Sequence, residues 1–158
     1  MGGNVITINP TGFSDWLALM RLLRQSFVYM DGVIDPPSSL QRLSLKRLKQ
    51  KAAGEDLYIV ERDHVLVACL FGCRKGDWYY VGKLAVDRAQ RRSGLARALI
   101  DAAMQHAQET GLKGVALQTR VELRNNHRSF RAMGFRLVGA SAHPGYDRAT
   151  SLTFRKPV

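Results

Sequence analysis

The boundary between residues 86 and 95 limits, more than any other feature, how this chain can fold. An apolar stretch typical of a strand (residues 78–86) leads into RRSGLARAL (residues 91–99), where helical periodicity begins. Between residues 88 and 100 there are four arginines and no acid. The first turn of a helix leaves backbone N–H groups unpartnered and is the positive end of the helix dipole. The junction therefore predicts a cradle for a phosphate or pyrophosphate, the alternative being a solvated turn in which Gly94 only permits close packing.

The charge balance also favours an anionic ligand. The 158 residues include 24 Lys and Arg against 13 Asp and Glu, a formal net charge of +11. Such an excess attracts nucleic acid, an anionic membrane surface or a phosphorylated small molecule, while the alternative is a basic surface that keeps the protein soluble. The length fits one domain, residues 1–158, that buries its own core.

Cys69 and Cys73, the only cysteines, lie four residues apart in one predicted strand. At about 3.3 Å per residue their Cα atoms are roughly 13 Å apart, too far for a disulfide, so both are expected to be buried thiols in a reducing compartment. The longest apolar run, residues 65–72, is too short to span a bilayer, and the N-terminus has no pattern of an export signal. We therefore expect a cytoplasmic protein without a membrane partner.

The remaining periodicities predict a mixed α/β sheet covered by helices. Three strand signals in succession form an antiparallel meander, and further strands alternate with helices after it. In chain order the expected elements are a strand (residues 5–8), helices (15–30 and 40–53), strands (56–62, 64–75 and 78–86), a helix (94–110), a strand (114–121), a short helix ending at residue 133, and strands (135–140 and 151–155).

The segment from Arg91 to Ala96, RRSGLA, resembles the acetyl-CoA signature Arg/Gln-x-x-Gly-x-Gly/Ala of the GNAT N-acetyltransferase superfamily. KLAVD before it is similar to the family's fourth strand, and ALIDAAMQHAQETGLKGVAL to its long helix and fifth strand. NNHRSFRAMGF resembles the short helix, ending in Gly-Phe, that closes the cofactor site. The likeness is strongest over residues 83–135 and architectural elsewhere. It implies a mixed, mostly antiparallel sheet of about seven strands flanked by four helices.

The resemblance implies acetyl-CoA as acetyl donor and no metal. In the family the fourth and fifth strands splay apart, and the pantetheine arm lies between them like an added strand. Backbone groups at residues 84–86 would bind the arm, with one N–H polarising the thioester carbonyl, and the amides of residues 92–96 would hold the pyrophosphate. The cofactor-binding residues implied in this way are Leu84, Ala85, Val86, Arg91, Arg92, Ser93, Gly94, Leu95, Ala96, Asn126 and Phe130.

The family reaction is direct attack of an acceptor amine on the acetyl carbon in a ternary complex, which requires a proton acceptor. Glu122, just past the predicted fifth strand, is the nominated base, with His127 and Tyr79 as alternatives. In many members a Tyr lies four residues before the Gly-Phe, and its hydroxyl protonates the leaving thiolate. This chain has Phe130 at that position. Tyr146 is the nominated replacement acid.

The acceptor pocket implied by the resemblance lies between the loops at residues 29–39 and 142–148. Asp31, Asp35 and Asp147 are acids in an otherwise basic chain and suggest attraction of a cationic amine, whereas Asp in such turns often only bonds the local backbone. The acceptor is expected to be a small molecule or a peptide amine. The acceptor-binding residues predicted are Asp31, Asp35, Tyr79 and His143.

Two other interpretations of the sequence compete with an acetyltransferase. A nucleic-acid-binding domain is favoured by the net charge and by the basic residues of the predicted helix 40–53, although no zinc pattern or RNP-like aromatic motif is present. A degenerate family member that binds acyl-CoA without catalysis is favoured by Phe130. Similar proteins are commonly dimers, so a homodimer is the candidate assembly.

Overall fold

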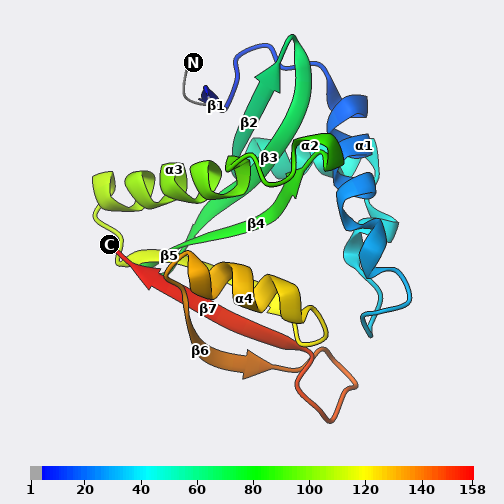
Figure 1. The fold of residues 1–158 in the computed structure, drawn as a ribbon, viewed down its shortest axis with the longest axis vertical. Coiled ribbons are helices and arrows are strands. Elements are labelled where there is room, and N and C mark those ends of the chain that lie inside the picture. The colour runs from blue at the N-terminus through cyan, green and yellow to red at the C-terminus, as the bar shows by residue number, and fades with distance from the viewer. Residues whose placement is uncertain (1–4) are drawn as a thin grey trace.

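The computed structural model describes residues 5–158 (Figure 1). In this part of the chain the sheet has seven strands, and four α-helices flank it. The strands are β1 (Ile6–Ile8), β2 (Asp56–Arg62), β3 (Val65–Lys75), β4 (Trp78–Val86), β5 (Gly114–Arg120), β6 (Arg136–Ser141) and β7 (Ser151–Pro157). The α-helices are α1 (Trp16–Phe27), α2 (Leu45–Gly54), α3 (Leu95–Glu109) and α4 (Arg124–Ala132), and short 3₁₀ turns lie at Val28–Met30, Ser39–Arg42 and Arg88–Gln90.

The strands are ordered β1-β2-β3-β4-β5-β7-β6, and each neighbouring pair is antiparallel except β4 and β5. The exception follows from the connection, because β4 and β5 are joined through α3 and a strand–helix–strand unit makes its strands parallel. This architecture confirms the predicted mixed, mostly antiparallel sheet of seven strands with four helices.

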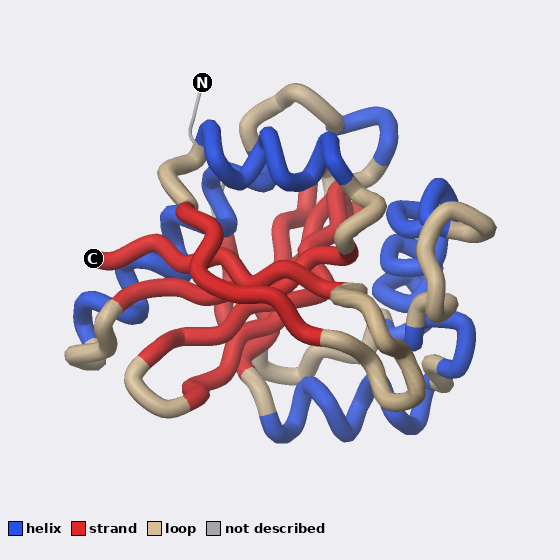
Figure 2. Tube along the Cα trace, turned by 90° about the horizontal axis from the view of Figure 1, so that it is seen from below, coloured by secondary structure: helices blue, strands red, loops and turns tan. Residues whose placement is uncertain are grey.

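Helices cover both faces of the sheet (Figure 2). Along β2, Tyr58 and Val60 pack with α3, whereas Leu57 and Ile59 pack with α1 and α2, as the two-residue period of a strand requires. The core is thus divided into an α3 layer, which also receives Phe130 and Met133 of α4, and an α1/α2 layer.

The predicted helix over residues 40–53 is divided in the structure. A 3₁₀ turn ends at Arg42, Leu43 is extended, and α2 begins only at Leu45. The cause is local: the Ser44 hydroxyl accepts a hydrogen bond from the backbone N–H of Arg47 at 3.2 Å and caps a new helix. The short helix predicted to end at residue 133 could be capped by Asn125 or Asn126 according to its sequence, but α4 starts at Arg124 after Leu123, without a side-chain cap.

Both cysteines lie in β3 as free thiols, as predicted, but only Cys69 is buried, because Cys73 lies near the end of the strand where the burial pattern opens. Cys69 is fully buried, and burial raises the pKa of its thiol to about 12, so it is unreactive. Among residues 5–158, the longest apolar helical stretch falls short of what crossing a bilayer requires.

A polar chain of side chains is buried in the α3 layer. The Tyr58 and Tyr79 hydroxyls lie 3.0 Å apart, and Tyr79 donates to Asp56 at 2.7 Å. Burial and these two bonds raise the pKa of Tyr79 far above its usual value, so it stays protonated. Gly72 of the neighbouring strand leaves the room that this ring occupies, because a Cβ there would lie 2.4 Å from the Tyr79 hydroxyl oxygen.

We therefore expect Gly72→Ala to destabilise the fold by about 1–3 kcal/mol, because the methyl group forces a buried ring to move. Urea unfolding of the variant measures the change. The matched control is Gly139→Ala in β6, where a Cβ meets no heavy atom within 4 Å. Equal stability of the two variants would contradict this account of the core.

Candidate active site

β4 and β5 are paired only where they begin. Hydrogen-bonded register extends from Trp78 opposite Gly114 to Tyr80 opposite Ala116, and no pairing between these strands follows in the described chain. Beyond it the part of the sheet formed by β5, β7 and β6 fans away from β4 (Figure 1). The edge of β4 from residue 81 to residue 86 is thus left without a neighbouring strand on the side of β5.

A β-bulge interrupts β4 on this open edge. Gly82 pairs with Phe71 and Ala85 pairs with Cys69, so Lys83 and Leu84 together oppose the single residue between them. Lys83 has φ +51°, an uncommon value for a residue with a side chain. The bulge changes the alternation of the strand: Tyr79 and Val81 pack in the α3 layer before it, and Leu84 and Val86 do so after it.

A cavity of about 520 Å³ opens between the separated strands. Its walls come from the segment joining α1 and α2, from both diverging strands, and from α2, α4 and the β6–β7 loop. The lining side chains most relevant to chemistry are Tyr29, Arg42, Lys51, Tyr80, Lys83, Leu84, Thr119, Arg120, Asn126, Phe130 and His143. Thr119 is 7% exposed, and its hydroxyl has no hydrogen-bond partner in the described structure.

The arginine-rich turn leads from the open end of β4 into α3. Gly94 is the N-cap of α3 with φ +81°, a conformation that glycine adopts without cost, and Arg92 also has a positive φ of 65°. Arg92, Ser93 and Gly94 are exposed, and the first-turn amides of α3 follow them. The Ser93 hydroxyl donates to the carbonyl oxygen of Gln90. The predicted strand–turn–helix junction is present.

This turn lies beside the cavity, although residues 91–96 are not part of its lining. The Arg91 guanidinium carbon lies 6.0 Å from the centre of the Tyr29 ring, and Tyr29 lines the cavity. On its other side the turn borders a groove of about 400 Å³, whose walls include Arg24, Arg88 and Arg91. The basic turn and the cavity are therefore adjacent parts of one surface.

Two nominated catalytic residues, Glu122 and Tyr146, lie in a polar cluster that ties two loops together. Asp35 accepts hydrogen bonds from Tyr146 at 2.6 Å and from Arg148 at 3.2 Å. Glu122 accepts from the Asp35 backbone N–H at 3.3 Å and lies 3.8 Å from Arg148. The bond to Asp35 raises the pKa of the Tyr146 hydroxyl. Neither Glu122 nor Tyr146 lines the cavity.

Arg120 strengthens the same connection. Its guanidinium donates to the backbone oxygens of Pro36 and Pro37 at 2.6 and 3.4 Å. Hydrogen bonds from β5 and from the β6–β7 loop thus hold the loop at residues 35–39 in place. Asp35, predicted as a ligand for the acceptor, is used as a structural tie between these loops.

The other predicted residues divide between the cavity and positions away from it. Leu84, Asn126, Phe130 and His143 line the cavity. Tyr79 does not, because its ring is buried between strands and α3, and Ala85 is buried in the α1/α2 layer. Asp31 is exposed and accepts a long hydrogen bond of 3.5 Å from Gln41. The Val86 carbonyl oxygen accepts from Ser26 at 3.2 Å.

The sequence reasoning missed the bulge and most of the polar side chains that line the cavity. Gly82 inside a strand pattern, followed by the charged Lys83, was the available signal for the bulge. Nothing local marks the others, because the fold brings them together from distant segments. They are Tyr29, Arg42, Lys51, Tyr80, Lys83, Thr119 and Arg120.

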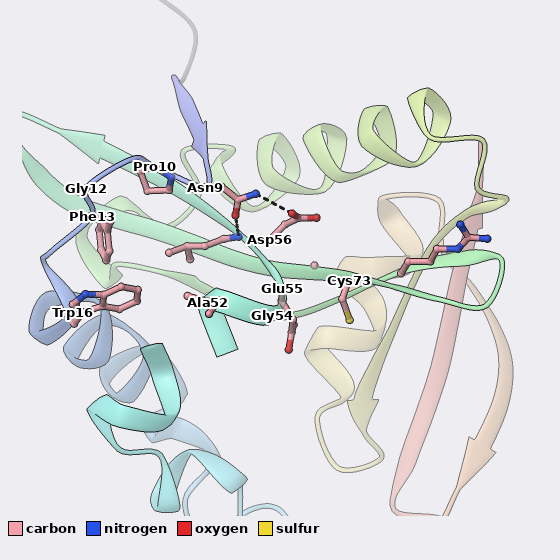
Figure 3. A pocket seen from close by; sticks show the side chains of 14 residues that line it. Asn9, Pro10, Gly12, Phe13, Trp16, Ala52, Gly54, Glu55, Asp56 and Cys73 are labelled. Carbon is pink, nitrogen blue, oxygen red and sulfur yellow. Dashed lines mark hydrogen bonds between the residues drawn. The ribbon is translucent and has the colours of Figure 1, made fainter. Parts of the chain in front are cut away.

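A second cavity, of about 570 Å³, lies where β2 begins and β3 ends (Figure 3). Phe13 and Trp16 stack edge to face in its wall, with ring centres 4.9 Å apart. Its carboxylates are already bound: Asp56 to Tyr79 and Asn9, and Glu55 to Lys51 at 2.7 Å. The candidate active site is therefore the cavity between β4 and β5, which has an unpaired strand edge and a helix N-terminus beside it.

Comparison with known families and structures identifies relatives of this chain. The sequence matches the family described as "Acetyltransferase (GNAT) family" over residues 16–135. The match includes the bulged strand, the basic turn, α3, β5 and α4. No curated protein sequence matches the chain significantly.

Solved structures share the fold at low sequence identity. The PaiA N-acetyltransferase from Thermoplasma acidophilum, in complex with coenzyme A, has a TM-score of 0.78 at 13% identity, over 98% of this chain and 99% of its own. A GNAT family acetyltransferase from Elizabethkingia anophelis with acetyl-CoA bound has a TM-score of 0.72 at 14% identity, over 98% and 97%. The ribosomal-protein-S18-alanine N-acetyltransferase from Escherichia coli has a TM-score of 0.70 at 16% identity, over 97% and 94%.

We expect Arg148→Met to loosen the loop at residues 31–39, because Arg148 bonds both Asp35 and Glu122. Amide hydrogen exchange of this loop is expected to accelerate several-fold, while the melting temperature falls by no more than about 3 °C, since exposed ion pairs contribute about 0–1 kcal/mol. Arg97→Met, an exposed change on α3, is the control. Unchanged exchange in Arg148→Met would contradict the tie.

Proposed function

The chain belongs to the acetyltransferase (GNAT) family, and we propose that it transfers the acetyl group of acetyl-CoA to a primary amine by direct attack in a ternary complex. One observation carries the proposal: the open edge of β4 leads directly to the glycine-capped N-terminus of α3. An extended arm can pair with such an edge, and a diphosphate can bind at such a helix end. The low identity to the solved acetyltransferases leaves the acceptor to be argued from this chain alone.

The residues present fit acetyl-CoA. The amides that follow Gly94 and the exposed Arg91 and Arg92 offer donors and positive charge for the pyrophosphate. The free edge at residues 84–86 offers backbone groups for the pantetheine arm, and the orphaned hydroxyl of Thr119 faces the same cavity from β5. When bound, acetyl-CoA would supply a thioester activated for attack by an amine.

The bulge is the proposed carbonyl-polarising element. At Lys83 and Leu84 the backbone leaves the regular ladder, so an N–H there is free to be aimed into the cavity. A fixed donor that meets developing negative charge on the carbonyl oxygen is typically the largest electrostatic contribution to such a reaction. We place this role at Leu84, the bulge residue that lines the cavity.

The acceptor must lose a proton to react. Glu122 remains the proposed base, and it would act through water because it does not line the cavity. One of its oxygens, Oε1, is buried without a hydrogen-bond partner in the described structure, so the proposed role requires that a water enter beside it. Its other oxygen is held by the Asp35 N–H.

Tyr29 and Tyr146 are alternative proposed proton donors for the leaving thiolate, and the geometry favours Tyr29. Phe130 lines the cavity but has no hydroxyl. Tyr29 lines the same cavity, and its hydroxyl lies 3.4–3.5 Å from the side-chain amide of Asn126. The Tyr146 hydroxyl, by contrast, donates a hydrogen bond to Asp35.

We expect Gly94→Glu to reduce affinity for CoA at least about tenfold, because it places a negative charge where the diphosphate binds and removes a cost-free left-handed residue. Isothermal titration calorimetry with CoA measures the affinity.

Gly76→Glu is the matched control for this measurement. Gly76 has φ +60° in the β3–β4 turn, and a Cβ there meets no heavy atom within 4 Å, as at Gly94. Both variants thus carry the same strain and the same added charge. Equal CoA affinity in the two, or no affinity in the unmodified protein, would refute the proposed function.

We expect Tyr29→Phe to lower kcat at least about tenfold, since general acid assistance is typically worth about 10²–10⁴-fold and water replaces part of it. Tyr146→Phe is expected to stay within about twofold of the unmodified protein, because its hydroxyl is engaged with Asp35 outside the cavity. Steady-state release of CoA, with affinity for CoA checked separately, measures both. The opposite ranking would assign the acid to Tyr146.

A further inference from the structure

The charges inside the candidate active site are all of one sign. Among the described residues that line the cavity, the charged side chains are Arg42, Lys51, Lys83 and Arg120, and Asp and Glu are absent. None of these cations comes from the basic turn before α3. The cavity therefore carries positive charge of its own, apart from the proposed site for the diphosphate.

The four cations differ in how far they are neutralised. Lys51 pairs with Glu55 at 2.7 Å, and Arg120 is bound by the carbonyl oxygens of Pro36 and Pro37. In the described part of the chain no carboxylate lies within 4.0 Å of the Lys83 ammonium group. Arg42 also has no carboxylate within 4.0 Å in the described part of the chain, but Arg42 is exposed. Lys83 is therefore the partly buried cation of the cavity that has no ion-pair partner among the described residues.

Lys83 is also the cation in the least favourable surroundings. It is partly buried, and burial lowers the pKa of its ammonium group, with the nearby Lys51 as the second cause. Lys51 and Lys83 both line the cavity and repel each other, and an anion bound near both would interact favourably with each.

The acids that could bind a cationic acceptor are engaged elsewhere. Asp35 is tied to Tyr146 and Arg148, and Glu122 is tied to the Asp35 backbone and lies beside Arg148. Neither lines the cavity. Glu55 acts on Lys83 but is already paired with Lys51. A polyamine or other polycation would thus meet an excess of positive charge in the cavity, and close like charges repel.

We propose that the acceptor is an amine that also bears an anionic oxygen group, a carboxylate or a phosphate, bound by Lys83 and Lys51. The inference rests on the proposed acetyl transfer and specifies its substrate class. Lys83 precedes Leu84, where the thioester carbonyl is proposed to be held, so the anion and the reacting amine would lie close together in one small molecule. An α-amino acid or an amino-alkyl phosphate has this geometry.

The test compares amines that differ only in the anionic group. The pairs are L-phenylalanine with 2-phenylethylamine, L-leucine with 3-methylbutylamine, and O-phosphoethanolamine with ethanolamine, and putrescine is the cationic probe. Release of CoA from saturating acetyl-CoA is measured, and kcat/KM is expressed per concentration of free amine. We expect at least a tenfold preference for the anionic member, and the better of the amino acid and phosphate pairs identifies the anion.

Lysine variants connect the preference to the site. Lys83→Met is expected to lower kcat/KM for the anion-bearing amine at least tenfold, while kcat/KM for the partner that lacks the anion and the KM for acetyl-CoA stay within about twofold. Lys83→Arg is expected to recover part of the loss. Lys49→Met is the matched control, because Lys49 is exposed on the same helix as Lys51 and does not line the cavity.

Three outcomes overturn the inference. The first is turnover of putrescine, or of the amines that lack the anionic group, as fast as that of the anion-bearing amines. The second is an equal effect of Lys83→Met on both members of a pair. In either case the proposed acetyl transfer stands. If no amine is turned over, L-phenylalanine and O-phosphoethanolamine are titrated into the CoA-saturated protein, and a lack of binding is the third. The proposed function is tested separately, by the CoA affinity of the unmodified protein and of the Gly94→Glu variant.

Discussion

The short parallel pairing of β4 with β5 is the constraint on which the rest of the site depends. Only three residue pairs join these strands, and β5 then follows β7 along its whole length instead. Gly114 permits β5 and β7 to approach each other closely, because any Cβ on it would lie 2.1 Å from the Lys156 carbonyl oxygen. The sheet is thus held together at one end by a close backbone approach and opened at the other. The opening supplies a cavity, a free strand edge and a helix N-terminus in one place.

Electrostatics divides this opening into two parts. The turn before α3 presents arginines on a glycine-capped helix end, which suits a diphosphate. The cavity beside it contains cations from α2, β4 and β5. Acids near the cavity are used to fasten the loops over it, as the bonds of Asp35 to Tyr146 and Arg148 illustrate. Acidic side chains thus hold the surrounding loops together, and basic side chains line the interior of the cavity.

The sequence was sufficient for the features that are local in the chain. Alternation located the strands, and the combination of Gly94 with helical periodicity located the start of α3. The break inside residues 40–53 was missed because a Ser44 cap competes with a continuous helical pattern only once Leu43 adopts an extended conformation. Tyr79 was assigned to the acceptor pocket because a tyrosine in a strand gives no sign of its face, and the structure buries it against Asp56. The charge of the cavity depends on contacts between segments far apart in sequence, which no local pattern encodes.

Lys83 illustrates why the face of a side chain cannot be read from alternation alone. Counted in steps of two from Val81, Lys83 would enter the α3 layer, where a charge would be buried among apolar side chains. The bulge adds one residue, so Leu84 and Val86 take the α3 layer and Lys83 lies near Lys51 instead. A single backbone irregularity therefore has two effects: it frees backbone groups at Leu84 from the ladder, and it brings a cation into the cavity. If both effects serve one reaction, the polarising backbone and the anion-binding charge are positioned by the same bulge, and their relative placement is as rigid as the strand that carries them.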